Sequence, residues 1–449
     1  MKKILMFPWL AFGHISPFLE MAKRLSKFNF HIYICSSPIN LQSIKPKLSD
    51  EYSSSIELIE IHLPSLPDLP PHLHTTNGLS SHLMPTLLKA FDMSAPEFTT
   101  ILHNLKPDLL INDILQPWAT QIASSLNIPV THFITAGVIT LGFALQSHNP
   151  EIPIPDVDLG YHWFFKKMIN SGASEEPDSD SNLNRLWKTL VGLGHLSNTI
   201  LANTFTELES DHINYLSLLL NKKVLPIGPL VQKLTSIPNP NDEEKKPEPL
   251  EWLDKKSPKS TVYVSFGSEC YLSKEGMEEL SHGLEQSGAN FIWVIRFPKG
   301  EKKTMRDELP EGYLERVGER GMVIEGWAPQ MRILEHSSVG GFVSHCGWNS
   351  MAEAAVIGVP IIALPMQLDQ PWNGKIAEQC GIGVVAKRGE EGEIMREEIR
   401  EVIKEVVFEE KGEKMRKKVK EISAVLKEKE GEITDGLVNE LNLLCQAKI

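Results

Sequence analysis

Residues 3–35 read KILMFPWLAFGHISPFLEMAKRLSKFNFHIYIC, and this stretch decides the fold. Lys3–Phe7 is an apolar run of strand length, and residues 12–17 contain the glycine and proline of a loop. Residues 18–25 have the amphipathic pattern of a helix, and residues 31–35 form a second apolar run. A strand, a helix and another strand in this order are typical of a parallel sheet, because neighbouring parallel strands need a crossover connection. We therefore expect an α/β fold.

The same alternation continues along the chain and restarts once after residue 250. This pattern predicts two doubly wound, Rossmann-like domains whose sheets face a shared cleft with their carboxyl ends, where ligands of open α/β sheets bind. The further strands that we expect are Leu109–Ile111, Val130–Phe133 and Thr199–Ala202 in the first domain and Thr261–Ser265, Phe291–Ile295, Gly341–Val343 and Ile361–Leu364 in the second.

A proline-rich, charged segment without apolar periodicity separates the two series of strands. It reads IPNPNDEEKKPEP over residues 237–249, a composition typical of a linker. We predict an N-terminal domain over residues 1–236, a linker over 237–250 and a C-terminal domain over 251–449, whose final helix can pack back on the N-terminal domain. The length of 449 residues suits two domains of this size.

Composition and charge exclude several classes of protein. Hydrophobic residues make up 41% of the chain, so it can bury a core, and the net charge is −13. An acidic chain repels phosphate backbones and anionic lipid, so we expect no nucleic-acid partner. The five cysteines lie far apart without a C-x-x-C pair, which suits a reducing compartment. No apolar run approaches the roughly 20 residues that span a bilayer, so the sequence favours a cytoplasmic monomer or small oligomer without a transmembrane segment.

Several common catalytic motifs are missing from the sequence. It contains neither a P-loop nor a G-x-S-x-G nucleophile turn. Residues 192–197, GLGHLS, lack the third glycine of a dinucleotide-binding fingerprint. Asp156-Val157-Asp158 and Asp178-Ser179-Asp180 have the spacing that can hold a metal on a diphosphate, but neither follows a strand. We interpret both triplets as solvated loops and predict no catalytic metal.

The segment from Trp327 to Gln370 contains the most informative pattern, W-A-P-Q … H-C-G-W-N-S … E … D-Q. Trp327 offers an aromatic plate to a flat base. A strand is followed by a polar turn over residues 344–350 and by a helix that opens at Met351. A helix N-terminus presents unpaired N–H groups and a partial positive charge, which suit a diphosphate.

Polar side chains gather around that helix N-terminus. His345 adds a hydrogen-bond donor, and Asn349 and Ser350 add an amide and a hydroxyl at the same end. Glu353 lies one turn further into the helix, where its carboxylate can accept from both hydroxyls of a ribose. The simpler interpretation of Asn349-Ser350 is a helix cap.

Asp369-Gln370 follows another strand and can bind the hydroxyls of a sugar. Its simpler interpretation is a surface turn, and Trp327 could likewise be a core aromatic. At these spacings, however, a base plate, a phosphate-binding helix end, a ribose carboxylate and a sugar-binding pair together predict a nucleotide-sugar site.

This segment resembles the signature of the plant UDP-dependent glycosyltransferases (family 1, GT-B fold), and the resemblance extends over essentially the whole chain. It implies UDP-glucose as the donor substrate, with no metal and no other cofactor. It also implies a role for each matching residue. Trp327 and the Ala328 backbone would bind uracil, and Gln330 and Glu353 would bind the ribose. The diphosphate would be bound by Gly267, Ser268, His345, Gly347, Asn349 and Ser350. The sugar would be bound by Trp348, Asp369 and Gln370.

A base is needed to move a sugar to an alcohol, because a neutral hydroxyl is a poor nucleophile at pH 7. His14 lies in the loop after the first strand, and Asp113 ends the strand that begins at Leu109. A carboxylate on the far imidazole nitrogen fixes the tautomer and stabilises the imidazolium. Asp108 is the rival carboxylate, but it precedes that strand. The family resemblance supports His14 and Asp113 as the catalytic pair.

Thr135, after another strand, matches a family position that bonds an outer hydroxyl of the donor sugar. The implied mechanism is an in-line displacement with inversion, in which His14 takes the acceptor proton while UDP departs toward the helix N-terminus.

The acceptor is predicted from the branch that the chain resembles. Residues 6–17, 74–79 and 266–269 are similar to members that add a sugar to the sugar of an existing glycoside, such as a flavonoid or terpenoid glycoside. The polar residues 72–77 could bond that sugar or form an ordinary loop. At Cys270 the chain departs from the aromatic residue of many relatives, which we interpret as bearing on the acceptor end and not on the donor site.

The sequence thus predicts an inverting glucosyltransferase that moves glucose from UDP-glucose to a sugar hydroxyl of a small-molecule glycoside and forms a disaccharide. Alternatives are a first-sugar glucosyltransferase on a free aglycone and a UDP-sugar epimerase or hydrolase. A non-catalytic UDP-sugar binder would be expected to lack His14 or Asp113.

Overall fold

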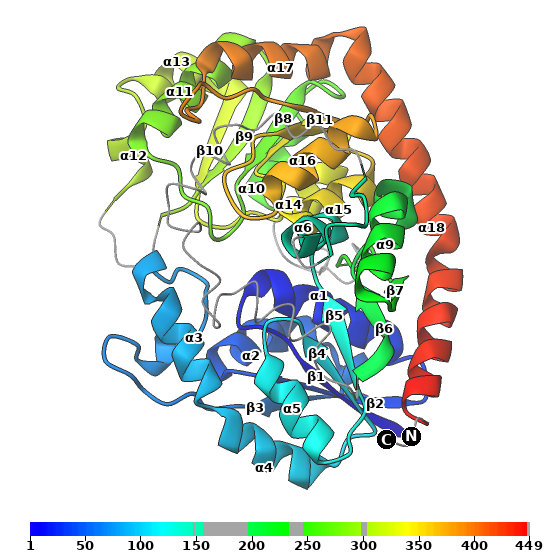
Figure 1. The fold of residues 1–449 in the computed structure, drawn as a ribbon. Helices are drawn as coiled ribbons and strands as arrows, with labels where there is room; N and C mark the ends of the chain where they lie inside the picture. Colours follow the sequence, from blue (N-terminus) through cyan, green and yellow to red (C-terminus); the bar gives the residue numbers. More distant parts are fainter. Residues whose placement is uncertain (147–148, 156–195, 233–245, 298–302, 447–449) are drawn as a thin grey trace. The chain divides into compact units, whose positions relative to one another are not determined.

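The structure is a computed structural model of the 449-residue chain, and it describes residues 1–146, 149–155, 196–232, 246–297 and 303–446 (Figure 1). The two D-x-D triplets and the GLG segment at 192–194 lie outside the described residues, as does most of the predicted linker at 237–250.

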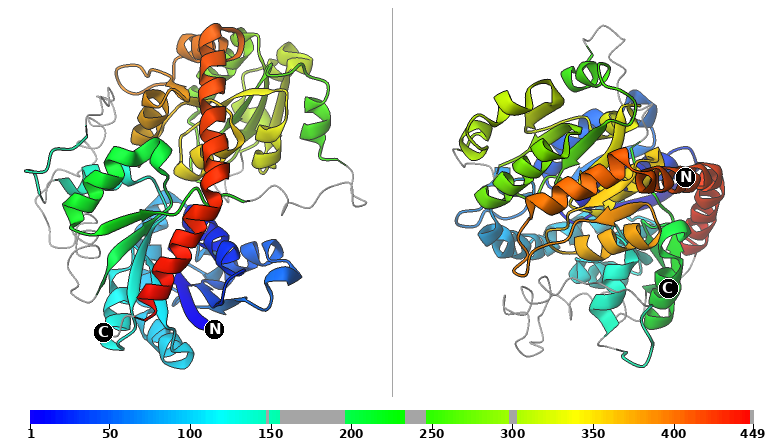
Figure 2. Two further views of the ribbon diagram at one scale, coloured as in Figure 1. Left: turned by 90° about the vertical axis from the view of Figure 1, so that its right-hand side faces the viewer. Right: turned by 90° about the horizontal axis from the view of Figure 1, so that it is seen from above.

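The chain divides into two compact units. The first contains Met1–Pro155, the segment that ends at Val231 and the chain from Lys429 onward. The second contains the chain from Gln232 to Glu428. Helix α18 (Glu410–Leu444) therefore begins in the second unit and ends in the first, and Figure 2 shows it as one continuous helix.

The first unit is built on a seven-stranded sheet with the strand order β3-β2-β1-β4-β5-β6-β7. All its pairs are parallel, with Ile4 in register with Ile32 on one side and Leu109 on the other. The strands are β1 (Lys2–Phe7), β2 (Phe30–Ser36), β3 (Ile56–Glu60), β4 (Leu109–Asp113), β5 (Val130–Ile134), β6 (Leu196–Ala202) and β7 (Lys223–Pro226).

Helices cover both faces of this sheet, because side chains of a strand alternate between its faces. Ile4 and Met6 of β1 pack with Phe18 of α1, whereas Leu5 and Phe7 pack with residues of α3 and α4. The helices of this unit are α1 (Phe12–Leu25), α2 (Pro38–Ile44), α3 (Met84–Asp92), α4 (Ala95–Leu105), α5 (Pro117–Ser125), α6 (Val138–Leu145), α9 (Thr206–Leu220) and the end of α18, whose Leu437 and Leu441 join the α1 side of the core.

The second unit contains a six-stranded parallel sheet with the order β10-β9-β8-β11-β12-β13. Its strands are β8 (Thr261–Ser265), β9 (Asn290–Ile295), β10 (Gly321–Glu325), β11 (Val339–Ser344), β12 (Ile361–Ala363) and β13 (Gly383–Val385). Its helices are α10 (Glu248–Leu253), α11 (Lys274–Ser287), α12 (Met305–Glu308), α13 (Tyr313–Val317), α14 (Gln330–Glu335), α15 (Trp348–Ile357), α16 (Gln370–Gln379), α17 (Arg396–Phe408) and the start of α18.

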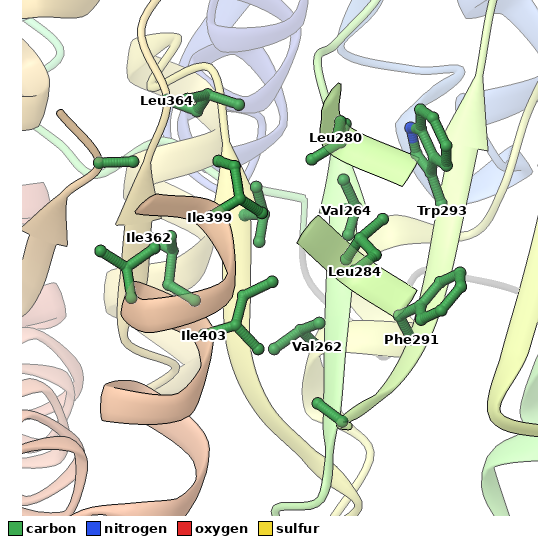
Figure 3. Close-up of a cluster of buried hydrophobic side chains, with 14 of the residues drawn as sticks. Val262, Val264, Leu280, Leu284, Phe291, Trp293, Ile362, Leu364, Ile399 and Ile403 are labelled. Carbon is green, nitrogen blue, oxygen red and sulfur yellow. The ribbon is translucent and has the colours of Figure 1, made fainter. Parts of the chain in front are cut away.

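Helices α11 and α17 cover one face of the second sheet. Leu280 and Leu284 of α11 and Ile399 and Ile403 of α17 pack on strand side chains such as Val262, as Figure 3 shows. The helices approach closely because a glycine, Gly283, lies at the contact.

A Cβ atom on Gly283 would lie 2.6 Å from the Cβ of Ile399.

The two parallel sheets confirm the predicted α/β architecture. Among the described residues, no helix is both long and apolar enough to cross a membrane.

Candidate active site

His14 lies in the first turn of α1, which corrects the predicted loop over residues 12–17. The helix begins at Phe12 and contains Pro17. Glycine and proline both argue against a helix, so the sequence prediction started it too late. Pro17 lies in the second turn, where its missing N–H removes one hydrogen bond to the residue four positions earlier. The imidazole therefore projects from a rigid element.

His14 and Asp113 meet at the carboxyl end of the first sheet. His14 Nδ1 lies 2.7 Å from Oδ2 of Asp113, which ends β4 and is fully buried. The Asp113 carboxylate also accepts hydrogen bonds from the backbone amides of Trp9 and Leu115, each at 3.2 Å. An ionised carboxylate only accepts hydrogen bonds, so Nδ1 carries the proton and Nε2 is the basic nitrogen of the neutral imidazole.

Asp108, the rival carboxylate, lies before β4, at the opposite end of that strand from Asp113. Its Oδ2 accepts from the backbone amide of Lys3 at 2.8 Å in an exposed contact. As expected, Asp113 lies at the carboxyl end of β4 beside His14, whereas Asp108 lies at the other end of the strand.

Thr135 follows β5 and makes a second contact to the same ring nitrogen. Its Oγ1 lies 3.0 Å from His14 Nδ1, and the side chain is buried. Because the Nδ1 proton is directed to Asp113, the threonine oxygen acts as a second acceptor and its own proton points elsewhere. Sequence reasoning assigned Thr135 to the donor sugar and missed this contact, since nothing in the sequence relates residues 14 and 135.

In the second unit, α15 begins at Trp348 and not at Met351, which corrects the predicted turn over residues 344–350. Its N-cap is Gly347, which has no side chain to accept from the first amides. Asn349 and Ser350 consequently lie inside the first turn, and their interpretation as a cap is wrong. The first turn of α15 presents its amides at the carboxyl end of β11, where an anion can bind.

His345 lies between two glycines beside that helix end. A Cβ atom on Gly267 would lie 2.9 Å from the imidazole, and one on Gly347 would lie 2.6 Å from its Nε2. Gly267 also has a φ of +73°, which favours glycine. Burial lowers the pKa of His345 to about 4, so the imidazole is a neutral hydrogen-bond donor at pH 7.

The residues predicted for the ribose contact each other. Gln330 at the start of α14 donates from Nε2 to Oε2 of Glu353 at 2.7 Å and to Oγ of Ser350 at 3.2 Å. Trp327, after β10, is 74% exposed, so its interpretation as a core aromatic is wrong. The neighbouring Ala328 is buried.

The pair predicted for the sugar is more enclosed than a surface turn. Asp369 is the N-cap of α16 and accepts from Asn373 Nδ2 at 2.7 Å. Gln370 is 4% exposed, and its Oε1 accepts from the backbone amides of Met366 at 2.9 Å and Gln367 at 3.0 Å.

Trp348, the third residue predicted for the sugar, is also buried. Gln370 donates from Nε2 to Sγ of Cys270 at 3.4 Å. This contact places Cys270 beside Gln370, a residue predicted for the donor sugar, whereas the sequence interpretation related Cys270 to the acceptor end.

The polar loop predicted for the acceptor is divided between buried and exposed residues. His74, Thr75 and Thr76 are buried, and the Thr76 amide and Thr75 hydroxyl donate to the carbonyl of Leu10 at 3.2 Å and 3.5 Å. Side chains of the exposed positions, among them His72, remain on the surface of the first unit. Among the described residues, no group of three or more His, Cys, Asp or Glu side chains could hold a metal ion.

Comparison with known proteins identifies the family of the chain. Residues 203–435, more than half of the chain, match the family model described as UDP-glucoronosyl and UDP-glucosyl transferase. A mogroside IIIx synthase of Siraitia grosvenorii is 53% identical over 449 residues, covering 99% of this chain and 98% of that protein. A beta-D-glucosyl crocetin beta-1,6-glucosyltransferase of Gardenia jasminoides is 42% identical, covering 98% of both chains.

Two further proteins extend the comparison. A flavanone 7-O-glucoside 2''-O-beta-L-rhamnosyltransferase of Citrus maxima is 40% identical, covering 94% of this chain and 93% of that one. The solved structure of a UDP-glucosyltransferase from Polygonum tinctorium has a TM-score of 0.79 and 26% identity, covering 100% of this chain and 99% of that one. The fold is GT-B, as predicted. The chain belongs to the UDP-glucoronosyl and UDP-glucosyl transferase family and is a UDP-glycosyltransferase.

Proposed function

We propose that this enzyme transfers glucose from UDP-glucose, with inversion, to a sugar hydroxyl of a plant glycoside and so forms a disaccharide. The proposed role of His14 as the base is supported by the 2.7 Å contact between its Nδ1 and the buried carboxylate of Asp113. This contact makes Nε2 the basic nitrogen, at the edge of the sheet where ligands of α/β folds bind.

In the proposed step, His14 Nε2 takes the proton of the acceptor hydroxyl as its oxygen attacks C1 of glucose. The C1–O bond to the diphosphate breaks on the opposite face, so the anomeric configuration inverts. Asp113 stabilises the imidazolium that forms. General base catalysis of this kind supplies roughly 10²–10⁴-fold of rate.

We infer that the first unit binds the acceptor and the second unit binds the UDP-sugar. Exposed Trp327 would stack on uracil, beside the Ala328 backbone, and the bonded pair of Gln330 and Glu353 would hold the ribose. Gly267, Ser268, His345, Gly347, Asn349 and Ser350 would surround the diphosphate, and Trp348, Asp369 and Gln370 would face the glucose.

Gln370 would contribute through its Nε2 group. Its Oε1 already accepts two backbone amides and one N–H is directed to Cys270 Sγ, so the second N–H is the group that would donate to a sugar oxygen. Asp369 would supply the carboxylate acceptor of the same site.

We propose that turnover needs no metal. The first turn of α15 supplies N–H groups and the positive end of the helix dipole to the departing diphosphate, and neutral His345 supplies a further donor. Turnover should survive excess EDTA, and complete loss that Mg²⁺ or Mn²⁺ restores would contradict this proposal.

The glycoside acceptor is supported by relatives. The names of the Gardenia and Citrus enzymes, 42% and 40% identical to this chain, each give a glucoside as the molecule that receives the new sugar. A site that pairs its polar groups with a sugar favours a glycoside, because a free aglycone leaves those groups unpaired.

We also propose a cytoplasmic location. All five cysteines are free, and Cys35 and Cys346 are fully buried thiols, as expected where thiols stay reduced.

Mass spectrometry of UDP-glucose incubated with a panel of aglycones and their monoglucosides tests this function. We expect a mass gain of one hexose on a monoglucoside and slow loss of UDP-glucose without acceptor. Rapid turnover of UDP-glucose alone would indicate a hydrolase or epimerase and would contradict the proposal.

A further inference from the structure

A buried polar cluster holds the connection between β5 and α6 and has no part in the chemistry proposed above. It consists of Asn203, Thr204 and Glu209, and we refer to it as the 203–209 cluster. All three side chains are fully buried. Asn203 and Thr204 follow β6, and Glu209 lies in the first part of α9.

Glu209 caps helix α6 from another element. The N-cap of α6 is Gly137, which has no side chain, so the amides of Val138 and Ile139 need other acceptors. Glu209 Oε2 accepts from the Val138 amide at 3.0 Å, and Oε1 accepts from the Ile139 amide at 2.9 Å. Thr204 Oγ1 donates to the same Oε2. Both carboxylate oxygens are thus used, which fixes the first turn of α6 in position.

The geometry of Glu209 is unusual for a helical residue. Its φ of −123° and ψ of 25° interrupt α9, so the chain bends where the carboxylate turns toward α6. A buried carboxylate without partners is strongly unfavourable, and here the partners are amides at the positive end of a helix. Charge-assisted hydrogen bonds of this kind are short and directional, so the cluster defines a geometry as well as filling space.

Asn203 holds the other end of the connection. Its Nδ2 donates to the backbone carbonyl of Thr135 at 3.3 Å, and its backbone amide donates to Ile134 at 2.7 Å. Its Oδ1 accepts from the amide of Leu230 at 2.9 Å, which ties the asparagine to a third segment. Thr135 is therefore fixed on both sides, by Asn203 before α6 and by Glu209 at its start.

Thr135 is the residue whose Oγ1 lies 3.0 Å from His14 Nδ1. We propose that the 203–209 cluster sets this threonine against the imidazole, and that Asn203 and Glu209 are positioning residues for the base. The Thr135 contact acts on the same ring nitrogen as Asp113, so it restricts rotation of the imidazole and helps to set the direction of Nε2. A displacement of about 1 Å can cost on the order of 10²-fold in rate.

This inference rests on the proposed role of His14, and the Glu209→Gln variant tests it. Glutamine keeps the volume but turns an N–H₂ group toward one of the two backbone amides, so one donor loses its acceptor. We expect kcat to fall by about 10- to 100-fold while KM for UDP-glucose changes less than about threefold, since the cluster acts on geometry at the base. An unchanged kcat would overturn the proposal.

A double-mutant cycle with Thr135→Ala separates positioning from general structural support. If Glu209 acts through Thr135, the double variant should lose no more than about two- to threefold beyond the more damaging single variant. Losses in kcat that multiply, or a Thr135→Ala variant with full kcat, would overturn the proposal.

Glu440→Gln is the matched control. This partly buried carboxylate accepts from Thr199 Oγ1 of β6 at 2.6 Å and pairs with Lys223 at 2.7 Å, in the same unit as the cluster. Its loss should lower the melting temperature and leave kcat unchanged. An equal fall of kcat in this control would show a structural effect alone and overturn the proposal.

Two further variants, Thr204→Val and His14→Ala, distinguish failure of the positioning role from misfolding and from failure of the proposed function. If Glu209→Gln does not fold, Thr204→Val removes only the third hydrogen bond to the carboxylate, and we expect a several-fold loss in kcat. Full turnover in His14→Ala would contradict the proposed function itself. Loss of turnover in His14→Ala with wild-type kcat in Glu209→Gln and Thr204→Val would contradict the positioning role alone.

Discussion

At the scale of single residues, the proposed reaction depends on the orientation of the His14 imidazole, which takes the proton of the acceptor hydroxyl. His14 is held by α1 on one side and by Asp113 Oδ2 at 2.7 Å on the other. The aspartate is itself fixed by two backbone amides, so the pair does not have to reorganise when the proton moves.

Replacing His14 by alanine should remove the base without disturbing the second unit. We expect kcat to fall by about 10²–10⁴-fold with UDP affinity nearly unchanged, because general base catalysis contributes roughly that much. Steady-state kinetics and UDP titration calorimetry measure the two quantities. The exposed His103→Ala variant in the same unit is the control and should keep its kcat. Retained turnover in a folded His14→Ala variant would rule the assignment out.

The sequence predicted the His14–Asp113 contact but not the contacts of Thr135 or Cys270. Histidine and aspartate each follow a strand of one parallel sheet, and the ends of such strands lie together, so the pair could be predicted. The Thr135–His14 contact and the Cys270–Gln370 contact join residues far apart in the chain through side-chain directions. No periodicity or spacing encodes those directions.

At the scale of elements, the strands that the sequence did not predict all lie at the edges of the two sheets. The predicted strands are the central ones, whereas β3, β7, β10 and β13 are the four edges of the two sheets. A central parallel strand is buried on both faces and gives a continuous apolar run. Three of these edge strands contain charged residues, as in IELIE of β3, KVLP of β7 and GMVIE of β10, and β13 begins with a glycine. The sequence prediction started α1 too late because Gly13 and Pro17 resemble a loop, and it started α15 too late because the polar residues that follow Gly347 resemble a turn.

The contact between α11 and α17 can be tested with a pair of glycine variants. In Gly283→Ala the new Cβ would lie 2.6 Å from Ile399 Cβ, so the two helices must move apart. We expect a loss of about 1–3 kcal/mol in the free energy of unfolding, as overpacked cores show.

The control is Gly431→Ala in α18, where a Cβ would meet nothing within 4 Å. Alanine should stabilise that helix by about 0.5–1 kcal/mol, because glycine is the poorer helix former. Denaturant unfolding of both variants measures the difference. A neutral Gly283→Ala would contradict the tight packing of the two helices.

At the scale of the whole molecule, two buried histidines link stability to pH. Burial lowers the pKa of His132 to about 3 and that of His345 to about 4. Each histidine is neutral in the folded chain but takes up a proton in the unfolded chain below about pH 6.5. The stabilisation is therefore complete above pH 6.5 and is lost progressively as pH falls toward the folded pKa values.

When the pH is lowered from 7 to 5, protonation of each of these histidines in the unfolded chain should reduce the free energy of unfolding by about 2 kcal/mol. His132→Gln removes one titrating group, so its stability should fall less steeply over this interval than that of the parent protein. Denaturant unfolding at several pH values gives the slopes, with His62→Gln, whose parent side chain is 63% exposed, as the control. Equal slopes in the parent and His132→Gln would contradict the assignment.

For the whole molecule, we propose that one unit holds a base for a glycoside hydroxyl and the other holds UDP-glucose. The most direct test is kcat/KM for an aglycone and for its monoglucoside, with UDP-glucose as donor and the product examined by proton NMR. We predict a higher kcat/KM for the monoglucoside and an inverted, β-configured glucose on a hydroxyl of the first glucose. A higher value for the free aglycone, or an α-configured product, would contradict it.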